Sequence, residues 1–140
     1  MDAIYTTEAL STGAGRDGHV SGLNGKLELE MRPPKELGGS GDGFNPEALF
    51  AAGYAACFHS ALQGVARQQK VKLVDSSVGA RVSIGNNGEG GFGLAVALEV
   101  VIPELEHDKA QELADAAHQV CPYSNATRGN IEVTVTVSDD

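Results

Sequence analysis

The sequence contains no tryptophan, and aromatic residues make up only 5% of its 140 residues. Proteins that bind single-stranded nucleic acids stack the bases on aromatic side chains, so this composition argues against such a platform. Basic residues are also scarce, with 10 Lys and Arg against 19 Asp and Glu and a formal net charge of −9. Because nucleic acids and anionic membranes attract basic patches, we expect neither as a partner.

The sequence also lacks long apolar runs and a visible targeting signal. A transmembrane helix needs about 18 consecutive apolar residues, and no stretch reaches that length. The first residues, Met1 to Tyr5, do not show the basic and then apolar segments of a secretory signal peptide. We therefore expect a cytoplasmic protein. The length predicts one domain over residues 1–140 with a core of its own.

The chain has only two cysteines, Cys57 and Cys121. Structural disulfides are uncommon in a reducing compartment, so we interpret these residues as free thiols or as a redox couple. Each lies on the apolar face of an expected helix. One interpretation is a pair of inert buried thiols, because free cysteine is among the most buried residue types. The other is a pair that reduces peroxide and forms a disulfide.

Hydrophobic periodicity predicts strands interrupted by two helices. Alternating or β-rich stretches indicate strands, and the Asn24-Gly25 pair indicates a two-residue hairpin. The expected strands cover residues 3–11, 19–23, 26–31, 77–84, 92–102 and 131–137, and the expected helices cover 46–69 and 108–121. This order, βββ-α-ββ-α-β, is typical of an α+β fold with antiparallel-rich sheets.

The first expected helix has a clear start. Asn45 is a good N-cap, Pro46 suits the first helical position, and the Glu47 carboxylate favours the positive end of the helix dipole. Residues 51–56 are mostly alanine, which allows another element to approach closely. A monomer of this length would hardly bury such a helix on all sides, so we expect a homodimer. The predicted apolar face consists of Leu49, Phe50, Gly53, Cys57, Ala61, Gly64, Val65 and Gln68.

A nucleophilic Cys57 must be a thiolate, and the middle of a helix offers nothing to lower its pKa. The candidate cation is Arg16, which stands alone in a glycine-rich turn, and Glu47 is a candidate to hold it through a bidentate ion pair. Both also have ordinary interpretations, as a solvated turn residue and as a carboxylate that complements the helix dipole. Glu47 and Cys57 are about 15 Å apart along the helix axis, so they cannot touch within one chain. Either an arginine spans this gap or the groups meet across a dimer interface, and we prefer the interface.

Cys121 lies where the second expected helix is interrupted by Pro122. Asp108 is the expected cap of this helix, whose apolar face consists of Ala110, Leu113, Ala114, Ala117 and Cys121. If Pro122 opens a new helical turn, Cys121 is its N-cap and suits the role of a resolving thiol. Otherwise Cys121 is a buried residue at a helix break.

A metal site is the competing interpretation of the same residues. His118 and Cys121 share a helical face, and Cys57 is a possible third ligand. His59 points away from Cys57 on its helix, and the chain has no closely spaced cysteine pair. On these residues alone we favour a thiol pair over a metal site.

Four motifs resemble those of the organic hydroperoxide resistance proteins, which belong to the osmotically inducible protein C superfamily. They occur in order along essentially the whole chain, and they are the stretches Gly15 to Gly18, Pro34 to Gly39, Asn45 to Phe58 and Val120 to Asn130. The resemblance implies the fold of this superfamily, with long central helices and an intertwined homodimer whose active sites lie at the subunit interface.

The resemblance also implies a thiol-dependent peroxidase that prefers organic hydroperoxides, including those of fatty acids, to hydrogen peroxide. By residue, it makes Cys57 the peroxidatic thiol and Cys121 the resolving thiol, while Arg16 activates Cys57 and Glu47 orients Arg16. The implied reductant is a dihydrolipoyl group on a lipoylated protein, and the resemblance implies neither a metal nor a bound organic cofactor. We further expect Phe50, Phe58 and the loop over residues 37–44 to shape an apolar substrate pocket.

Two alternatives stay open. One is a sister peroxidase of the same superfamily with a different peroxide preference. The other is a non-catalytic carrier of an apolar ligand, in which both thiols are simply buried.

Overall fold

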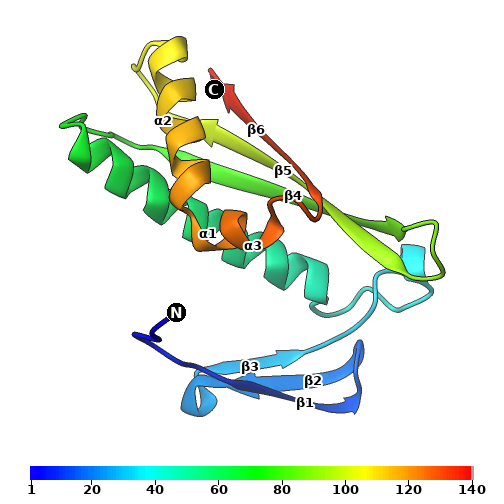
Figure 1. The fold of residues 1–140 in the computed structure, drawn as a ribbon. Helices are drawn as coiled ribbons and strands as arrows, with labels where there is room; N and C mark the ends of the chain where they lie inside the picture. The colour runs from blue at the N-terminus through cyan, green and yellow to red at the C-terminus, as the bar shows by residue number, and fades with distance from the viewer. Residues whose placement is uncertain (140) are drawn as a thin grey trace. The chain divides into compact units, whose positions relative to one another are not determined.

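Helix α1, Pro46–Gln68, is the longest element of the fold (Figure 1). The computed structural model describes residues 1–139. The chain divides into two units, Met1–Leu49 and Phe50–Asp140, and α1 begins at the end of the first unit. The structure thus confirms the predicted start of this helix and shortens its predicted end by one residue.

The first unit contains a three-stranded antiparallel sheet in the order β1-β2-β3. Its strands are β1 at Ala9–Ala14, β2 at Asp17–Gly22 and β3 at Leu27–Glu30. The 3-10 helices η1, Leu23–Gly25, and η2, Lys35–Leu37, follow β2 and β3. The predicted first strand, residues 3–11, was placed too early. Its Thr-, Ile- and Tyr-rich beginning lies outside β1, which instead continues into the stretch predicted as a turn.

Two glycine-containing turns shape this sheet. Gly15 and Arg16 alone connect β1 to β2, where Ala14 pairs with Asp17, and Gly15 adopts a positive φ of 66°. The second turn is at the predicted Asn24-Gly25 site, but it is longer than a two-residue hairpin. The last pair flanking it is Gly22 with Leu27, and η1 fills the connection.

The second unit contains a sheet in the order β4-β5-β6 and two further helices. Strand β5, Phe92–Val101, is central, with β4, Ser77–Asn86, antiparallel on one side and β6, Glu132–Ser138, parallel on the other. Helix α2, His107–Val120, follows β5, and the short helix α3, Pro122–Thr127, leads into β6 (Figure 1). The observed order confirms the predicted α+β class, with α3 as an addition.

The core of the second unit lies between α1, α2 and one face of this sheet. Its buried residues on α1 are Tyr54, Phe58, Leu62, Val65 and Ala66. Those on β5 are Val96, Leu98 and Val100, and those on α2 are Ala110, Leu113, Ala114 and Ala117. The buried face of α2 is the predicted one. The buried face of α1 matches the prediction only in part. Of the predicted residues, Val65 is buried, and Phe50, Cys57 and Ala61 pack against the core as partly buried residues. The fully buried Tyr54, Phe58 and Leu62 were not predicted, because alanines and glycines on all sides of this helix give it a weak apolar pattern.

The beginning of α2 also differs from expectation. The predicted cap, Asp108, lies inside the helix, and Glu106 is the N-cap. The Glu106 carboxylate accepts hydrogen bonds from the backbone N–H groups of Asp108 and Lys109. A carboxylate at this position satisfies two amides that have no partner within the helix.

None of the helices described within residues 1–139 combines the length and apolar character that a membrane-spanning helix requires.

Candidate active site

Glu47 lies in the first turn of α1, just after the predicted cap. The side-chain oxygen of Asn45 accepts a hydrogen bond of 2.8 Å from the backbone N–H of Ala48, which confirms Asn45 as the N-cap. The helix therefore begins at a defined residue, and this places the Glu47 carboxylate at the positive end of the helix dipole.

Glu47 binds the guanidinium of Arg16 through both carboxylate oxygens. Arg16 Nη1 donates to Oε2 at 3.0 Å, and Nη2 donates to Oε1 at 2.7 Å. The Arg16 side chain is 44% exposed, whereas that of Glu47 is 13% exposed. The hydrogen bond from Arg16 holds the pKa of the Glu47 carboxyl below its usual range, despite the opposing effect of burial. The pair forms within one chain and within the unit Met1–Leu49.

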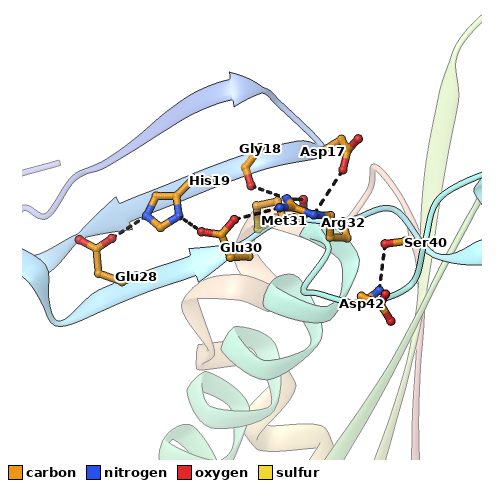
Figure 2. Close-up of polar contacts among 9 residues, drawn as sticks. All are labelled: Asp17, Gly18, His19, Glu28, Glu30, Met31, Arg32, Ser40 and Asp42. Carbon is orange, nitrogen blue, oxygen red and sulfur yellow. Dashed lines mark hydrogen bonds and ion pairs between the residues drawn. The ribbon is translucent and has the colours of Figure 1, made fainter.

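The turn that carries Arg16 is held by a second arginine, Arg32 (Figure 2). Arg32 Nη1 donates to the carbonyl oxygen of Gly18 at 3.0 Å, and its Nε lies 3.6 Å from a carboxylate oxygen of Asp17. A side chain on Gly18 would not fit, because its Cβ would lie 2.3 Å from the Thr12 carbonyl oxygen. The two residues that follow Arg16 are thus fixed by Arg32 and by close strand packing.

His19 lies between two carboxylates on the same sheet (Figure 2). Its Nε2 is 2.6 Å from Glu28, and its Nδ1 is 2.7 Å from Glu30. These contacts raise the pKa of His19, with the hydrogen bond to Glu28 as the largest cause. Each ring nitrogen donates to a carboxylate only in the protonated form, so the geometry matches a charged imidazolium.

The two cysteines meet in the second unit. The Sγ atoms of Cys57 on α1 and Cys121 between α2 and α3 lie 3.6 Å apart. Both are free thiols; Cys57 is half-buried and Cys121 is fully buried. Cys121 has an extended backbone and is the N-cap residue of α3, as predicted from Pro122. A disulfide bond is about 2.05 Å long, so a small movement would join the two sulfur atoms.

Burial raises the pKa of the Cys57 thiol above its usual value. The neighbouring Cys121 thiol raises it further, whereas a hydrogen bond from the backbone N–H of Tyr123 lowers it. Within the described part of the second unit, none of the groups that shift this pKa is a cation. A thiol with a raised pKa is mostly protonated at neutral pH unless a nearby cation lowers that pKa.

A hollow of 390 Å³ opens beside Cys57. Its lining is mostly small or apolar and comprises Cys57, Ser60, Ala61, Gly64, Val65, Gln68, Val120 and Pro122. A larger hollow of 640 Å³ lies along β1 and η1, but neither a cysteine nor Arg16 lines it. We therefore do not assign a catalytic role to it. Phe58, which we expected to shape a pocket, is fully buried in the core and lines neither hollow.

An aromatic cluster covers the turn of α1 that precedes Cys57. The ring of Tyr123 lies 5.9 Å from that of Phe50 and 5.5 Å from that of Tyr54, between centroids. Gly53 permits this packing, because a Cβ there would lie 2.7 Å from the Tyr123 hydroxyl oxygen and 3.2 Å from two ring atoms. Packing of the Tyr123 ring against α1 therefore also holds the Tyr123 backbone N–H that bonds Cys57.

A chain of buried hydroxyl groups next to the thiol pair was not predicted from the sequence. The Tyr54 hydroxyl oxygen lies 2.8 Å from Ser124 Oγ and 3.1 Å from Thr127 Oγ1, and Ser124 Oγ lies 2.7 Å from His118 Nδ1. Burial lowers the pKa of His118, and the charge of Arg128 lowers it further. The sequence offered one sign that these hydroxyl groups lie near the thiols, since Tyr54 and Ser124 are each three positions from a cysteine.

This geometry does not support the metal interpretation. His118 binds Ser124, and His59 Nε2 lies 2.9 Å from Ser76 Oγ. Across residues 1–139, no three His, Cys, Asp or Glu side chains form a group that could hold a metal ion.

The chain is similar to known proteins over most of its length. The family model described as OsmC-like protein matches residues 39–136. The organic hydroperoxide resistance protein of Xanthomonas axonopodis pv. citri is 51% identical, with 96% of this chain and 95% of that protein covered. OhrB of Bacillus subtilis, also named an organic hydroperoxide resistance protein, is 44% identical, with 94% and 96% covered.

A solved structure agrees with the sequence comparisons. The crystal structure of an organic hydroperoxide resistance protein from Elizabethkingia anophelis, with thiocyanate bound, superposes with a TM-score of 0.94. The two sequences are 55% identical, and the match covers 100% of both chains. The chain therefore belongs to the OsmC-like family and, within it, to the organic hydroperoxide resistance proteins.

Proposed function

We propose that this protein is a cysteine-based peroxidase that reduces organic hydroperoxides to alcohols. The observation that carries the proposal is the thiol pair, in which Cys57 and Cys121 are both free and their Sγ atoms lie 3.6 Å apart. The names of its relatives support hydroperoxides as the substrate class. A carrier with inert thiols would have no need to hold two cysteines so close together.

In the proposed first step, the Cys57 thiolate attacks the terminal oxygen of the hydroperoxide. The O–O bond breaks, the alkoxide leaves and takes a proton to become the alcohol, and Cys57 becomes a sulfenic acid. The sulfur is oxidised by two electrons, and the peroxide is reduced by two. The backbone N–H of Tyr123, which bonds Cys57, would stabilise the attacking thiolate.

In the second step, the Cys121 thiolate attacks the Cys57 sulfur and displaces its oxygen, which leaves as water after protonation. The product is a Cys57–Cys121 disulfide. Cys121 suits this role because it is the buried N-cap residue of α3 and already contacts Cys57. An external dithiol then exchanges with this disulfide and restores both thiols. We propose a dihydrolipoyl group on a lipoylated protein as this reductant.

Arg16 and Glu47 have supporting roles in this proposal. Cys57 has a raised pKa and requires a cation, and we assign that function to Arg16. Glu47 would orient Arg16, because its two oxygens hold the guanidinium in a bidentate pair. Arg16 would also donate hydrogen bonds to the peroxide oxygens.

The hollow beside Cys57 is the proposed entry for the organic part of the substrate. Its lining by small and apolar side chains favours an alkyl chain over hydrogen peroxide, which has no apolar part to bury. We further propose one domain over residues 1–140, a cytoplasmic location and an intertwined homodimer with the active sites at its interface.

Turnover of a bulky alkyl hydroperoxide, cumene hydroperoxide, with dihydrolipoamide tests the proposal. The wild-type protein should consume the peroxide, and Cys57→Ser should not. Unchanged turnover in Cys57→Ser would overturn the thiol mechanism, and no turnover by the wild type with any organic hydroperoxide would favour an apolar-ligand carrier. A parallel assay with hydrogen peroxide separates this proposal from a sister peroxidase with another preference.

A further inference from the structure

The hydroxyl chain next to the thiol pair connects three helices. Tyr54 is on α1, His118 is on α2, and Ser124 and Thr127 are on α3. Tyr54 and Ser124 are fully buried, and Thr127 is 5% exposed. No buried side-chain nitrogen or oxygen in the described residues lacks a hydrogen-bond partner, so each hydroxyl here is satisfied.

Each hydroxyl group has one proton to donate and can also accept, so the chain is satisfied in either direction. With a proton on His118 Nδ1, the donors run from His118 through Ser124 and Tyr54 to Thr127, which donates to the carbonyl oxygen of Ser124 at 3.2 Å. With Nδ1 unprotonated, Thr127 donates to Tyr54, Tyr54 to Ser124 and Ser124 to Nδ1, while the Ser124 carbonyl still accepts from the backbone N–H of Arg128 at 2.9 Å. Both directions use the same contacts between the three helices.

The hydroxyl chain and the thiol pair connect the same two segments. Tyr54 and Cys57 lie three residues apart on α1, and Cys121 and Ser124 lie three residues apart at the beginning of α3. Residues three apart in a helix lie on the same face, about one turn from each other. The Tyr54–Ser124 bond is therefore located one turn from the contact between Cys57 and Cys121.

Cys121 needs such support because it lies at the break between α2 and α3. Its φ of −63° and ψ of 125° are not helical, so the helical backbone does not continue through it. Its position relative to α1 depends on how α3 is held. Tyr54 reaches α3 through both Ser124 and Thr127, and His118 reaches Ser124 from the preceding helix.

We infer that Tyr54 and Ser124 are positioning residues for the resolving cysteine. Their hydrogen bond fixes α3 on α1 at the register in which the Cys121 sulfur faces the Cys57 sulfur. Without it, the reduced chain also populates arrangements in which the two sulfur atoms are apart, and disulfide formation must select against them. The role in peroxide reduction rests on the proposed function, whereas the effect on the thiol pair itself does not.

Equilibration with reduced and oxidised dithiothreitol tests this inference without any peroxide. Two electrons and two protons pass from the protein thiols to oxidised dithiothreitol, whose disulfide bond breaks as the Cys57–Cys121 bond forms. The fraction of protein disulfide, measured by mass spectrometry after thiol alkylation, gives the equilibrium constant. We expect Tyr54→Phe and Ser124→Ala each to lower it roughly threefold to tenfold, the size of one net hydrogen bond.

Ser76→Ala is the matched control. This change also removes a hydroxyl held by side chains of α1, since Ser76 Oγ contacts His59 and Gln63, but it leaves the thiol pair and the hydroxyl chain intact. Its equilibrium constant should equal that of the wild type. The inference is overturned if Tyr54→Phe and Ser124→Ala fold and have the same equilibrium constant as the wild type. It is also overturned if Ser76→Ala lowers the equilibrium constant as much as they do.

The rate of disulfide formation after one equivalent of cumene hydroperoxide adds a kinetic test. In both positioning variants, the sulfenic acid should form at the wild-type rate and convert to the disulfide more slowly. If the wild type forms no sulfenic acid, the proposed function fails, while the dithiothreitol equilibrium still tests the positioning role.

The ¹⁵N chemical shifts of His118 provide a spectroscopic readout of the same contacts. Ser124→Ala should change these shifts, because it removes the hydroxyl that lies 2.7 Å from His118 Nδ1. Identical His118 shifts in the wild type and in Ser124→Ala would contradict the contact through which α2 holds α3.

Discussion

Glu47 holds the guanidinium of Arg16 through two hydrogen bonds of 2.7 and 3.0 Å, and both residues belong to the same chain. Arg16 belongs to a two-residue turn between strands, and Glu47 to the first turn of a helix. The pair joins two stretches of sequence that separately have ordinary interpretations. In the proposed reaction, Arg16 is the cation assigned to Cys57, whose pKa is raised by burial.

Arg16→Ala should slow the oxidation of Cys57 about tenfold or more, since each unit of thiol pKa corresponds to a factor of about ten in thiolate. The pH dependence of alkylation by iodoacetamide, measured in Cys121→Ser so that only Cys57 reacts, gives that pKa. The midpoint should move upward in Arg16→Ala. Arg16→Lys should be intermediate, because lysine keeps the charge but loses the bidentate geometry.

Glu47→Gln should also slow the oxidation of Cys57, but less than Arg16→Ala does. Arg16 remains charged in this variant but loses the carboxylate that orients it. Glu36→Gln is the matched control, since it removes an acidic side chain of η2 outside the pair. If Glu47→Gln and Glu36→Gln behave alike, Glu47 has no specific role in the reaction.

Cys121→Ser should stop the reaction after its first step. Cys57 would be oxidised at close to the wild-type rate, but no thiol would lie 3.6 Å away to form the intramolecular disulfide. A sulfenic acid trap such as dimedone, detected by mass spectrometry on the peptide that contains Cys57, measures this. An intramolecular disulfide or an unmodified Cys57 in this variant would contradict the assigned roles.

Gly53→Ala should show energetic coupling to Tyr123. Alanine is favoured over glycine inside a helix by about 1 kcal/mol, so the substitution would normally stabilise α1. Here the new Cβ would displace the Tyr123 ring and offset that gain. In a Tyr123→Ala background the ring is gone, and the same substitution should stabilise the protein. Urea unfolding of the four proteins measures the coupling, and an equal gain in both backgrounds would contradict it.

Much of the fold follows from local sequence. Asn45 and Pro46 mark the start of α1, and the strict alternation before Gly85 marks β4. Pro122 begins a new helix, α3, and makes Cys121 its N-cap. Each of these features depends on residues that are close in sequence, and the structure confirms all of them.

Other features depend on distant partners and were missed. Every residue of β1 is exposed, and the strand is rich in Ala, Ser and Gly, so it is defined by pairing with β2 rather than by its own composition. The buried face of α1 was only partly assigned, because its small residues are similar on all sides. The hydroxyl chain joins residues up to 73 positions apart, and no local pattern shows that the Tyr54 hydroxyl is buried among polar groups.

His19 should titrate above its ordinary pKa of 6.5, because Glu28 and Glu30 stabilise its charged form. The unfolded chain loses this proton near pH 6.5, while the folded chain retains it to higher pH. The stability from these contacts is therefore present below pH 6.5 and is lost as pH rises through the raised pKa. NMR titration of the ring should show a lower midpoint in Glu28→Gln, and a wild-type midpoint below 6.5 would contradict the geometry.

The central claim is that Cys57 reacts with an organic hydroperoxide and is then captured by Cys121. The most direct measurement adds one equivalent of cumene hydroperoxide to the fully reduced protein and follows both cysteines by mass spectrometry, together with the cumyl alcohol released. We expect one alcohol for each Cys57–Cys121 disulfide formed, and no alcohol from Cys57→Ser. Alcohol production by Cys57→Ser at the wild-type level, or an unreacted peroxide beside an intact thiol pair, would contradict the account.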